Sequence, residues 1–217
     1  MKNSAQSFKN AVKLYVLILL VWGFYRALFK LPETIEELIL KPIIWLGPVL
    51  YFLSQEKSMI SSLGWTTKNL FQSLYLGIGL GMVFGVIAYI TNVAKYGGTA
   101  TLSGFGFDDK SLLFALGISF ITSVSEETVF RGYIQSRLTT GLKDATLAIA
   151  LTTLGWVIIH LPILIFGYQL SPADIIGRSL LTAAFGFGAS ILFARTQNIL
   201  APILLSIFWS WPILLFR

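Results

Sequence analysis

The chain has 217 residues, of which 55% are hydrophobic and 12% are charged, and its formal net charge is +6. Soluble domains carry about 25% charged residues, so this composition excludes an ordinary soluble domain and predicts an all-α, polytopic transmembrane helical bundle. The basic residues are scattered between apolar stretches, which excludes a nucleic-acid partner, and the absence of cysteine excludes disulfides and thiol chemistry.

Seven apolar stretches follow one another without a soluble insert, so we expect residues 1–217 to form one integral membrane domain. The predicted spans are residues 10–29, 38–53, 69–93, 111–138, 145–165, 179–194 and 198–216.

The first predicted span has a basic start, as signal peptides have, but its apolar part is too long for one, which predicts a retained anchor. Arg26 and Lys30 are expected to reach the membrane surface from its far end. Residues 31–37, with Pro32 and three glutamates, are predicted to form a loop. Pro42 and Pro48 in the short second span predict a kink or a tilt.

The third predicted span carries Gly77, Gly81 and Gly85, a spacing that lets two membrane helices approach closely. The glycine-rich segment that follows ends in Asp108 and Asp109, either of which is expected to cap the next helix.

Pro162 is predicted to bend or end the regular part of the fifth span. Residues 171–178 are predicted to form a loop, and Pro172 is expected to open the helix that follows.

Seven spans place the two ends of the chain on opposite sides of the membrane. The loops on the amino-terminal side carry slightly more Lys and Arg than those on the other side, which predicts an amino terminus inside the cell. We expect a multi-pass protein of the plasma (cell inner) membrane. This orientation would place Glu126 and Glu127 near the cytoplasmic face.

The most informative stretch is residues 125–131 (SEETVFR), which follows an apolar run. A charged side chain at the centre of a membrane helix costs roughly 3 kcal/mol or more, so such residues are candidates for function. In a helix, Glu127 and Arg131 share a face and are expected to pair, whereas Glu126 points about 100° away. Glu126 is therefore predicted to be unpaired and free for chemistry.

Two further polar elements lie in later spans. His160 is the only histidine, and Ser206 and Ser210 share one face of the last span. A helical bundle can bring these groups together with Glu126 around a water-filled cavity. The structural alternatives are an ion pair that only holds helices together, a hydrogen-bonded histidine, and serines that bond to their own helix.

The segment SEETVFRGYIQSRL resembles the Glu-Glu-x-x-x-Arg motif of the CPBP family, the CAAX proteases and bacteriocin-processing or immunity proteins, also called Abi. These are glutamate-type intramembrane proteases that include the Ras-converting CAAX endoprotease. Residues 156–160 (WVIIH) are similar to the second family motif, an aromatic residue followed by histidine four positions later. Residues 194–203 are similar to the segment before the last core helix. The resemblance covers about residues 110–217.

The chain departs from the family pattern in the last span. The family usually has His-x-x-x-Asn there, whereas Ser206 and Ser210 occupy these positions. Hydroxyls still donate hydrogen bonds, but losing one oxyanion donor typically costs a factor of roughly 10² to 10³ in rate. Reduced or absent activity is therefore a consequence to test.

The resemblance implies peptide-bond hydrolysis without a covalent intermediate, with Glu126 as the base that activates a water and His160 positioning that water or donating a proton. A carboxylate in a low-dielectric cavity binds a proton more readily than in water, which suits a general base. The other implied site residues are Glu127 and Arg131 as a supporting ion pair, Ser206 and Ser210 at the oxyanion, and Trp156 beside the substrate.

The expected partners are a peptide or protein substrate, with or without a lipid, and the bilayer; no cofactor and no metal are expected. A second interpretation is a non-catalytic family member that acts in bacteriocin immunity or as a scaffold. A zinc protease is disfavoured because there is one histidine and no His-Glu-x-x-His. A transporter with Glu126 as a proton relay ranks last, because no pair of broken helices is evident.

Overall fold

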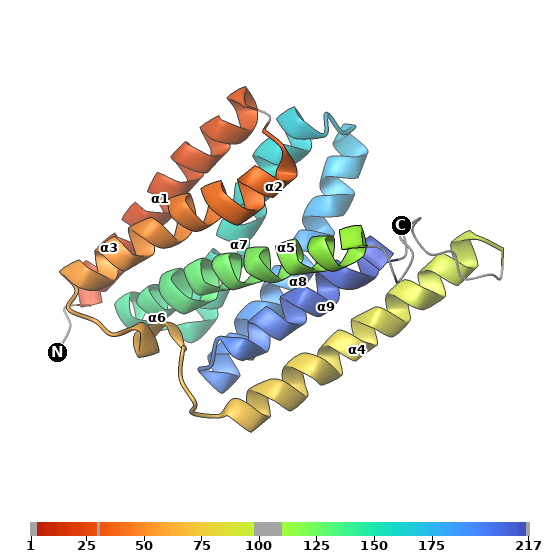
Figure 1. The fold of residues 1–217 in the computed structure, drawn as a ribbon. Helices are drawn as coiled ribbons and strands as arrows, with labels where there is room; N and C mark the ends of the chain where they lie inside the picture. The colour runs from red at the N-terminus through yellow and green to blue at the C-terminus, as the bar shows by residue number, and fades with distance from the viewer. Residues whose placement is uncertain (1–3, 30, 98–109, 216–217) are drawn as a thin grey trace.

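The computed structural model describes residues 4–29, 31–97 and 110–215, and the regular elements in these ranges are all helical (Figure 1). The α-helices are α1 (Ser4–Leu28), α2 (Glu33–Ile35), α3 (Gly47–Gln55), α4 (Leu70–Lys95), α5 (Lys110–Glu127), α6 (Ser136–Leu142), α7 (Ala145–Pro162), α8 (Pro172–Thr196) and α9 (Leu200–Leu215). Four π-helical segments are η1 (Glu36–Leu40), η2 (Pro42–Leu46), η4 (Thr128–Gln135) and η5 (Ile163–Gly167), and η3 (Ile60–Leu63) is a 3₁₀ turn. The all-α prediction is confirmed.

Six described helical stretches are long and apolar enough to cross a membrane. They are Ser4–Leu28, Glu36–Gln55, Leu70–Ala94, Leu113–Leu142, Ala145–Gly167 and Pro172–Thr196. The shorter apolar stretch Leu200–Trp211 lies where the last span is predicted, so about seven spans are consistent with the structure.

Two predicted loops are wrong because a helix begins inside each of them. Pro32 precedes a helix start, where its carbonyl accepts from the backbone N–H of Ile35 (2.9 Å), and η1 then buries two of the three glutamates. The helix α8 begins at Pro172, as expected, because the Ser171 side chain caps it by accepting from the N–H of Asp174. Residues 171–178 therefore belong mainly to the helix.

Pro162 marks a change of helix type, as the sequence predicted. The α-helix α7 ends at Pro162, and the chain continues directly into the π-helical η5. Asp108 and Asp109, the expected caps, lie outside the described residues.

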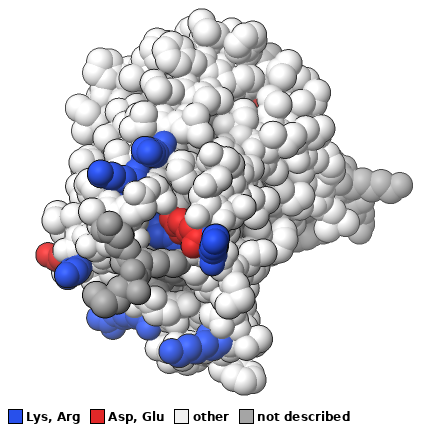
Figure 2. All heavy atoms as spheres, turned by 90° about the vertical axis from the view of Figure 1, so that its left-hand side faces the viewer, with Lys and Arg blue, Asp and Glu red and all other residues white. Residues whose placement is uncertain are grey.

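The helices run between two ends of the molecule (Figure 1). One end carries the start of α1, the η3 turn, the α6–α7 turn and the α8–α9 turn; the other carries the α1–α2 turn and the α7–α8 turn. Figure 2 views the side that includes the amino-terminal end and shows basic side chains around a small acidic group on an otherwise uncharged surface.

The glycines of α4 make room for α9. A Cβ on Gly77 would lie 2.8 Å from Leu204 Cβ, and one on Gly81 would overlap the Phe208 side chain. Gly85 has open space instead. The predicted close helix packing is therefore confirmed for Gly77 and Gly81 and wrong for Gly85.

A polar cluster at the amino-terminal end fixes the helix that carries the glutamate motif. The Glu56 carboxylate, just after α3, accepts hydrogen bonds from Asn10 Nδ2 (2.9 Å), Tyr133 Oη (2.7 Å) and Arg137 Nε (2.8 Å). Burial alone would raise the pKa of Glu56, but the two neutral donors and the Arg137 guanidinium outweigh burial and hold the pKa below its usual value. The cluster ties α1 and α3 to η4 and α6.

Candidate active site

The motif residues lie at the junction of α5 and the π-helical η4. Glu127 Oε1 is 3.0 Å from Arg131 Nη1, and both side chains are fully buried. The predicted ion pair is therefore confirmed. Arg131 Nη2 also donates to the carbonyl of Gly186 on α8 (3.0 Å), and the guanidinium lies 4.5 Å from the centre of the Trp156 ring on α7. The ion pair thus fixes the positions of η4, α7 and α8 relative to one another.

Gly186 makes this arrangement possible, and no pattern in the sequence singled it out. A Cβ at this position would lie 2.8 Å from Trp156 Cδ1 and 3.4 Å from Arg131 Nη2. The absence of a side chain lets α8 approach the ion pair and accept its hydrogen bond.

Glu126 is not free, so the prediction of an unpaired carboxylate is wrong. Its Oε1 lies 2.8 Å from Nζ of Lys41, which is buried and lies between η1 and η2. Lys41 Nζ also lies 2.5 Å from Glu37 Oε2. The reason is tertiary: the segment that contains η1 and η2 packs against α5. The spacing of Glu37 and Lys41 is the same four-residue spacing that identified Glu127 and Arg131.

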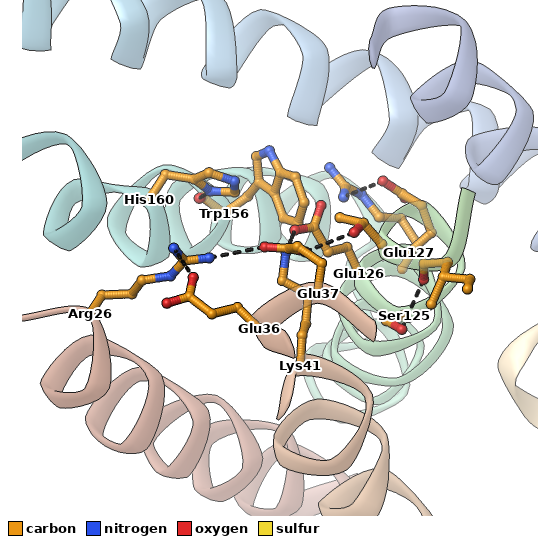
Figure 3. Close-up of polar contacts among 12 residues, drawn as sticks. Arg26, Glu36, Glu37, Lys41, Ser125, Glu126, Glu127, Trp156 and His160 are labelled. Carbon is orange, nitrogen blue, oxygen red and sulfur yellow. Dashed lines mark hydrogen bonds and ion pairs between the residues drawn. The ribbon is translucent and has the colours of Figure 1, made fainter. Parts of the chain in front are cut away.

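The charged cluster extends to the end of α1 (Figure 3). Glu37 Oε1 is 2.9 Å from Arg26 Nη2, and Arg26 Nη1 is 2.6 Å from Glu36 Oε2. Thr122 Oγ1 on α5 donates to Glu37 Oε2 (2.7 Å). Arg26 therefore pairs inside the bundle and does not extend to the membrane surface as expected; Lys30 lies outside the described residues.

His160 lies one turn beyond Trp156 on α7. Its Nδ1 is 2.7 Å from the Trp156 carbonyl, and the two ring centres are 4.5 Å apart. Since a carbonyl only accepts, Nδ1 carries a proton, and in the neutral form of the ring Nε2 is then an acceptor. His160 lines the same cavity as Lys41, which pairs with Glu126, so the structure brings His160 into the same polar site as Glu126 (Figure 3).

A cavity of about 360 Å³ lies beside this cluster. The charged and imidazole side chains that line it are Arg26, Glu36, Glu37, Lys41 and His160. The other lining residues lie just after α1 and in or just after η5. Catalytic groups commonly occupy such concave sites, where a few polar groups converge.

The cavity lies toward the end of the bundle opposite the amino terminus, because α1 and η5 both finish there (Figure 1). Glu126 itself lies near the middle of the continuous helical stretch Leu113–Leu142. The sequence predicted both an amino terminus inside the cell and a site near the cytoplasmic face. If the amino terminus is inside the cell, this fold places the cavity toward the side of the membrane away from the cytoplasm.

Ser206 and Ser210 lie on α9, as predicted, but their described contacts are local. Ser210 Oγ donates to the Ser206 carbonyl (2.9 Å), and Ser206 is buried. Among the hydrogen bonds of the described residues, none joins either hydroxyl to Glu126 or His160.

The four described π-helical segments all border the site. Of these, η1 contains Glu37, η2 begins directly after Lys41, η4 contains Arg131, and η5 begins three residues after His160. Single-turn π segments within α-helices are frequent at functional sites, because the wider turn redirects side chains. Within the described parts of the chain, no group of three or more His, Cys, Asp or Glu residues is suited to hold a metal.

Residues 108–212 match the family model described as type II CAAX prenyl endopeptidase Rce1-like. Over these residues the chain is similar to the Rce1-like family. The match spans a little under half of the 217 residues and includes Glu126, Glu127, Arg131, Trp156, His160, Ser206 and Ser210. Searches of curated proteins and of solved structures found no significant match.

The match and the six long apolar helices support an integral membrane protein with a fold of the CAAX-protease type, as the glutamate motif predicted. Arg26, Glu37 and Lys41 lie outside the part of the chain that matches the Rce1-like family. The charged cluster therefore joins the matched region to the spans that precede it.

Proposed function

We propose that this Rce1-like protein is an intramembrane endopeptidase that hydrolyses a peptide bond with a water activated by Glu126. The observation that carries the proposal is the convergence of Glu126 and His160, from two different helices, on one polar cluster beside a cavity. The order of the motifs along the chain supports the same reaction.

In the proposed reaction, Glu126 takes a proton from the water as the water oxygen attacks the carbonyl carbon. Lys41 bonds to Oε1 of Glu126, so the other carboxylate oxygen is the one available to the water. His160 Nε2 accepts the second water proton as a hydrogen bond and orients the attack, because Nδ1 is committed to the Trp156 carbonyl. Glu126 then returns the proton to the leaving nitrogen as the carbon–nitrogen bond breaks.

Glu127 and Arg131 support this geometry without contacting the substrate, and Trp156 positions His160. We propose that Ser206 and Ser210 donate to the developing oxyanion after their hydroxyls rotate. The substrate class is a peptide or protein, with or without a lipid, and the location is the plasma membrane.

The alternative is a non-catalytic role in bacteriocin immunity or as a scaffold. The contact of Glu126 with Lys41 and the serines at positions 206 and 210 favour it, because an ion-paired carboxylate is also a structural element. An assay of cell survival in the presence of a bacteriocin separates the two roles. A Glu126→Gln variant that protects cells as well as the wild type does supports the alternative.

The direct test is cleavage of peptides by the purified protein in liposomes. Peptide libraries with and without a C-terminal prenylcysteine motif would be digested and read by mass spectrometry. We expect Glu126→Gln and His160→Ala to lower the rate at least 10²-fold, as is typical for the loss of a general base. Full activity in either variant would remove that residue from the mechanism, and an inactive wild type would contradict the proposal.

A further inference from the structure

Lys41 lies outside the family-matched region and contacts the proposed base directly. Its Nζ lies between two carboxylates, 2.8 Å from Glu126 Oε1 and 2.5 Å from Glu37 Oε2. The side chain is 5% exposed, and it also lines the cavity that His160 lines. A buried ammonium needs such partners, because burying an unpaired charge is expensive.

The position of Lys41 is fixed from several sides. Glu37 is held in turn by Arg26 on α1 and by the Thr122 hydroxyl on α5. The Lys41 ammonium also lies 5.6 Å from the ring centres of Trp22 and Trp45. An ammonium held in this way restricts the orientation of the Glu126 carboxylate, which is itself only 12% exposed.

Comparison with the neighbouring ion pair indicates that Lys41 does more than hold helices together. The pair of Glu127 and Arg131 is fully buried, and neither residue lines the cavity. Lys41 lines the cavity and contacts the one motif carboxylate that remains partly exposed. A purely structural ion pair has no need of either feature.

We propose that Lys41 is a positioning residue of the hydrolytic site: it binds Oε1 of Glu126 and so directs the other carboxylate oxygen toward the water. This inference rests on the proposed function. It means that the spans before residue 108 complete the site and that the Rce1-like part of the chain does not contain every group the reaction needs. A misplacement of about 1 Å at a reacting group can cost roughly 10² in rate, which sets the expected effect.

The test is chemical replacement of the ammonium. The chain has no cysteine, so Lys41→Cys provides a unique thiol beside the cavity. Its thiolate displaces bromide from 2-bromoethylamine, which forms a carbon–sulfur bond and leaves an aminoethyl thioether with an ammonium close to the original position. We expect Lys41→Cys to lower kcat about 10²-fold with little change in KM, and aminoethylation to restore most of kcat.

Two controls make the result specific to the charge. Iodoethane gives an uncharged thioether and should restore nothing. Lys13→Cys, at an exposed position of α1, should keep full activity before and after either reagent. The conservative Lys41→Arg should retain more activity than Lys41→Met.

The charge-balanced double variant Lys41→Met with Glu37→Gln covers the case in which Lys41→Cys does not fold. It removes one charge of each sign and leaves Arg26 paired with Glu36. We expect the same loss of kcat. Wild-type kcat in the double variant or in Lys41→Cys, or equal restoration by iodoethane, would overturn the inference and leave the proposed function intact. A wild-type protein without activity would instead overturn both.

Discussion

Lys41 Nζ and Glu126 Oε1 lie 2.8 Å apart although 85 positions separate the two residues along the chain. The contact joins the second span to the helix of the glutamate motif, deep within the bundle. It also changes the chemical description of the site, because the proposed base works beside a fixed positive charge. Several measurable consequences depend on this contact and on the packing that produces it.

The first prediction concerns the coupling of Lys41 and Glu126 in stability. Breaking a buried ion pair by removing one partner typically costs about 3–5 kcal/mol, because the other charge remains buried without compensation. When Glu126 is replaced, Lys41 keeps Glu37 as a partner, whereas replacing Lys41 leaves the largely buried Glu126 without its ion-pair partner. We therefore expect Lys41→Met to destabilise the protein more than Glu126→Gln does. The double variant should be more stable than the sum of the two single effects predicts, by about 0.5–3 kcal/mol. Unfolding in detergent measures the cycle; strict additivity would contradict the contact.

The second prediction concerns Gly186. Gly186→Ala places a methyl group 2.8 Å from Trp156 Cδ1, so the tryptophan or the helix α8 has to shift. We expect a loss of about 1–3 kcal/mol in the free energy of unfolding and a lower cleavage rate, since Trp156 supports His160. Gly188→Ala on the same helix is the matched control, because nothing lies within 4 Å of its Cβ position. This substitution should leave the free energy of unfolding unchanged or raise it, because Ala has a higher helix propensity than Gly.

The third prediction concerns the contact between α4 and α9. Gly81→Val would overlap the Phe208 side chain, whereas Gly85→Val enters open space. We expect the first to lower the thermal unfolding midpoint by several degrees and the second to change it little. The measurement is a thermal-shift assay in one detergent. Equal effects of the two substitutions would show that α4 does not pack on α9 through this face.

The fourth prediction concerns acid stability and Glu56. Because the pKa of Glu56 is lower in the folded protein than in the unfolded chain, its contribution to stability is present above the unfolded value of about 4.3. That contribution is lost as the pH falls through the lower, folded pKa. Glu56→Gln should therefore be less stable at pH 7, where Arg137 loses its partner, and should lose less additional stability on acidification than the wild type. Unfolding midpoints between pH 7 and pH 3 measure this; parallel curves would contradict it.

The fifth prediction concerns orientation in the membrane. Lys57 lies in a turn at the amino-terminal end, and the exposed Tyr168 lies at the other end, beside the cavity. If the amino terminus is inside, a membrane-impermeant maleimide applied to whole cells should label Tyr168→Cys and spare Lys57→Cys. The reverse pattern would place the cavity on the cytoplasmic side. The wild-type chain, which has no cysteine, is the unlabelled control.

The sequence alone determined the features that depend on local spacing and composition. A low charged content and long apolar runs require helices, because backbone groups in lipid must be satisfied within each segment. Four-residue spacing placed Glu127 beside Arg131, and the glycine spacing in the third span predicted its close approach to a neighbour. The order of the motifs also sufficed to recognise the family.

Tertiary structure decided which polar groups meet. Nothing in the local pattern shows that the second span packs against the motif helix, so the partner of Glu126 and the inward pairing of Arg26 were not predictable from spacing. The predicted loop at residues 31–37 failed for a related reason: Glu36 and Glu37 are buried in a helix, where Arg26 from α1 and Lys41 one turn later neutralise them. Gly186 and the direction of the cavity likewise follow from helix packing. Charges that are too costly to bury alone become stable only when distant segments bring opposite charges together.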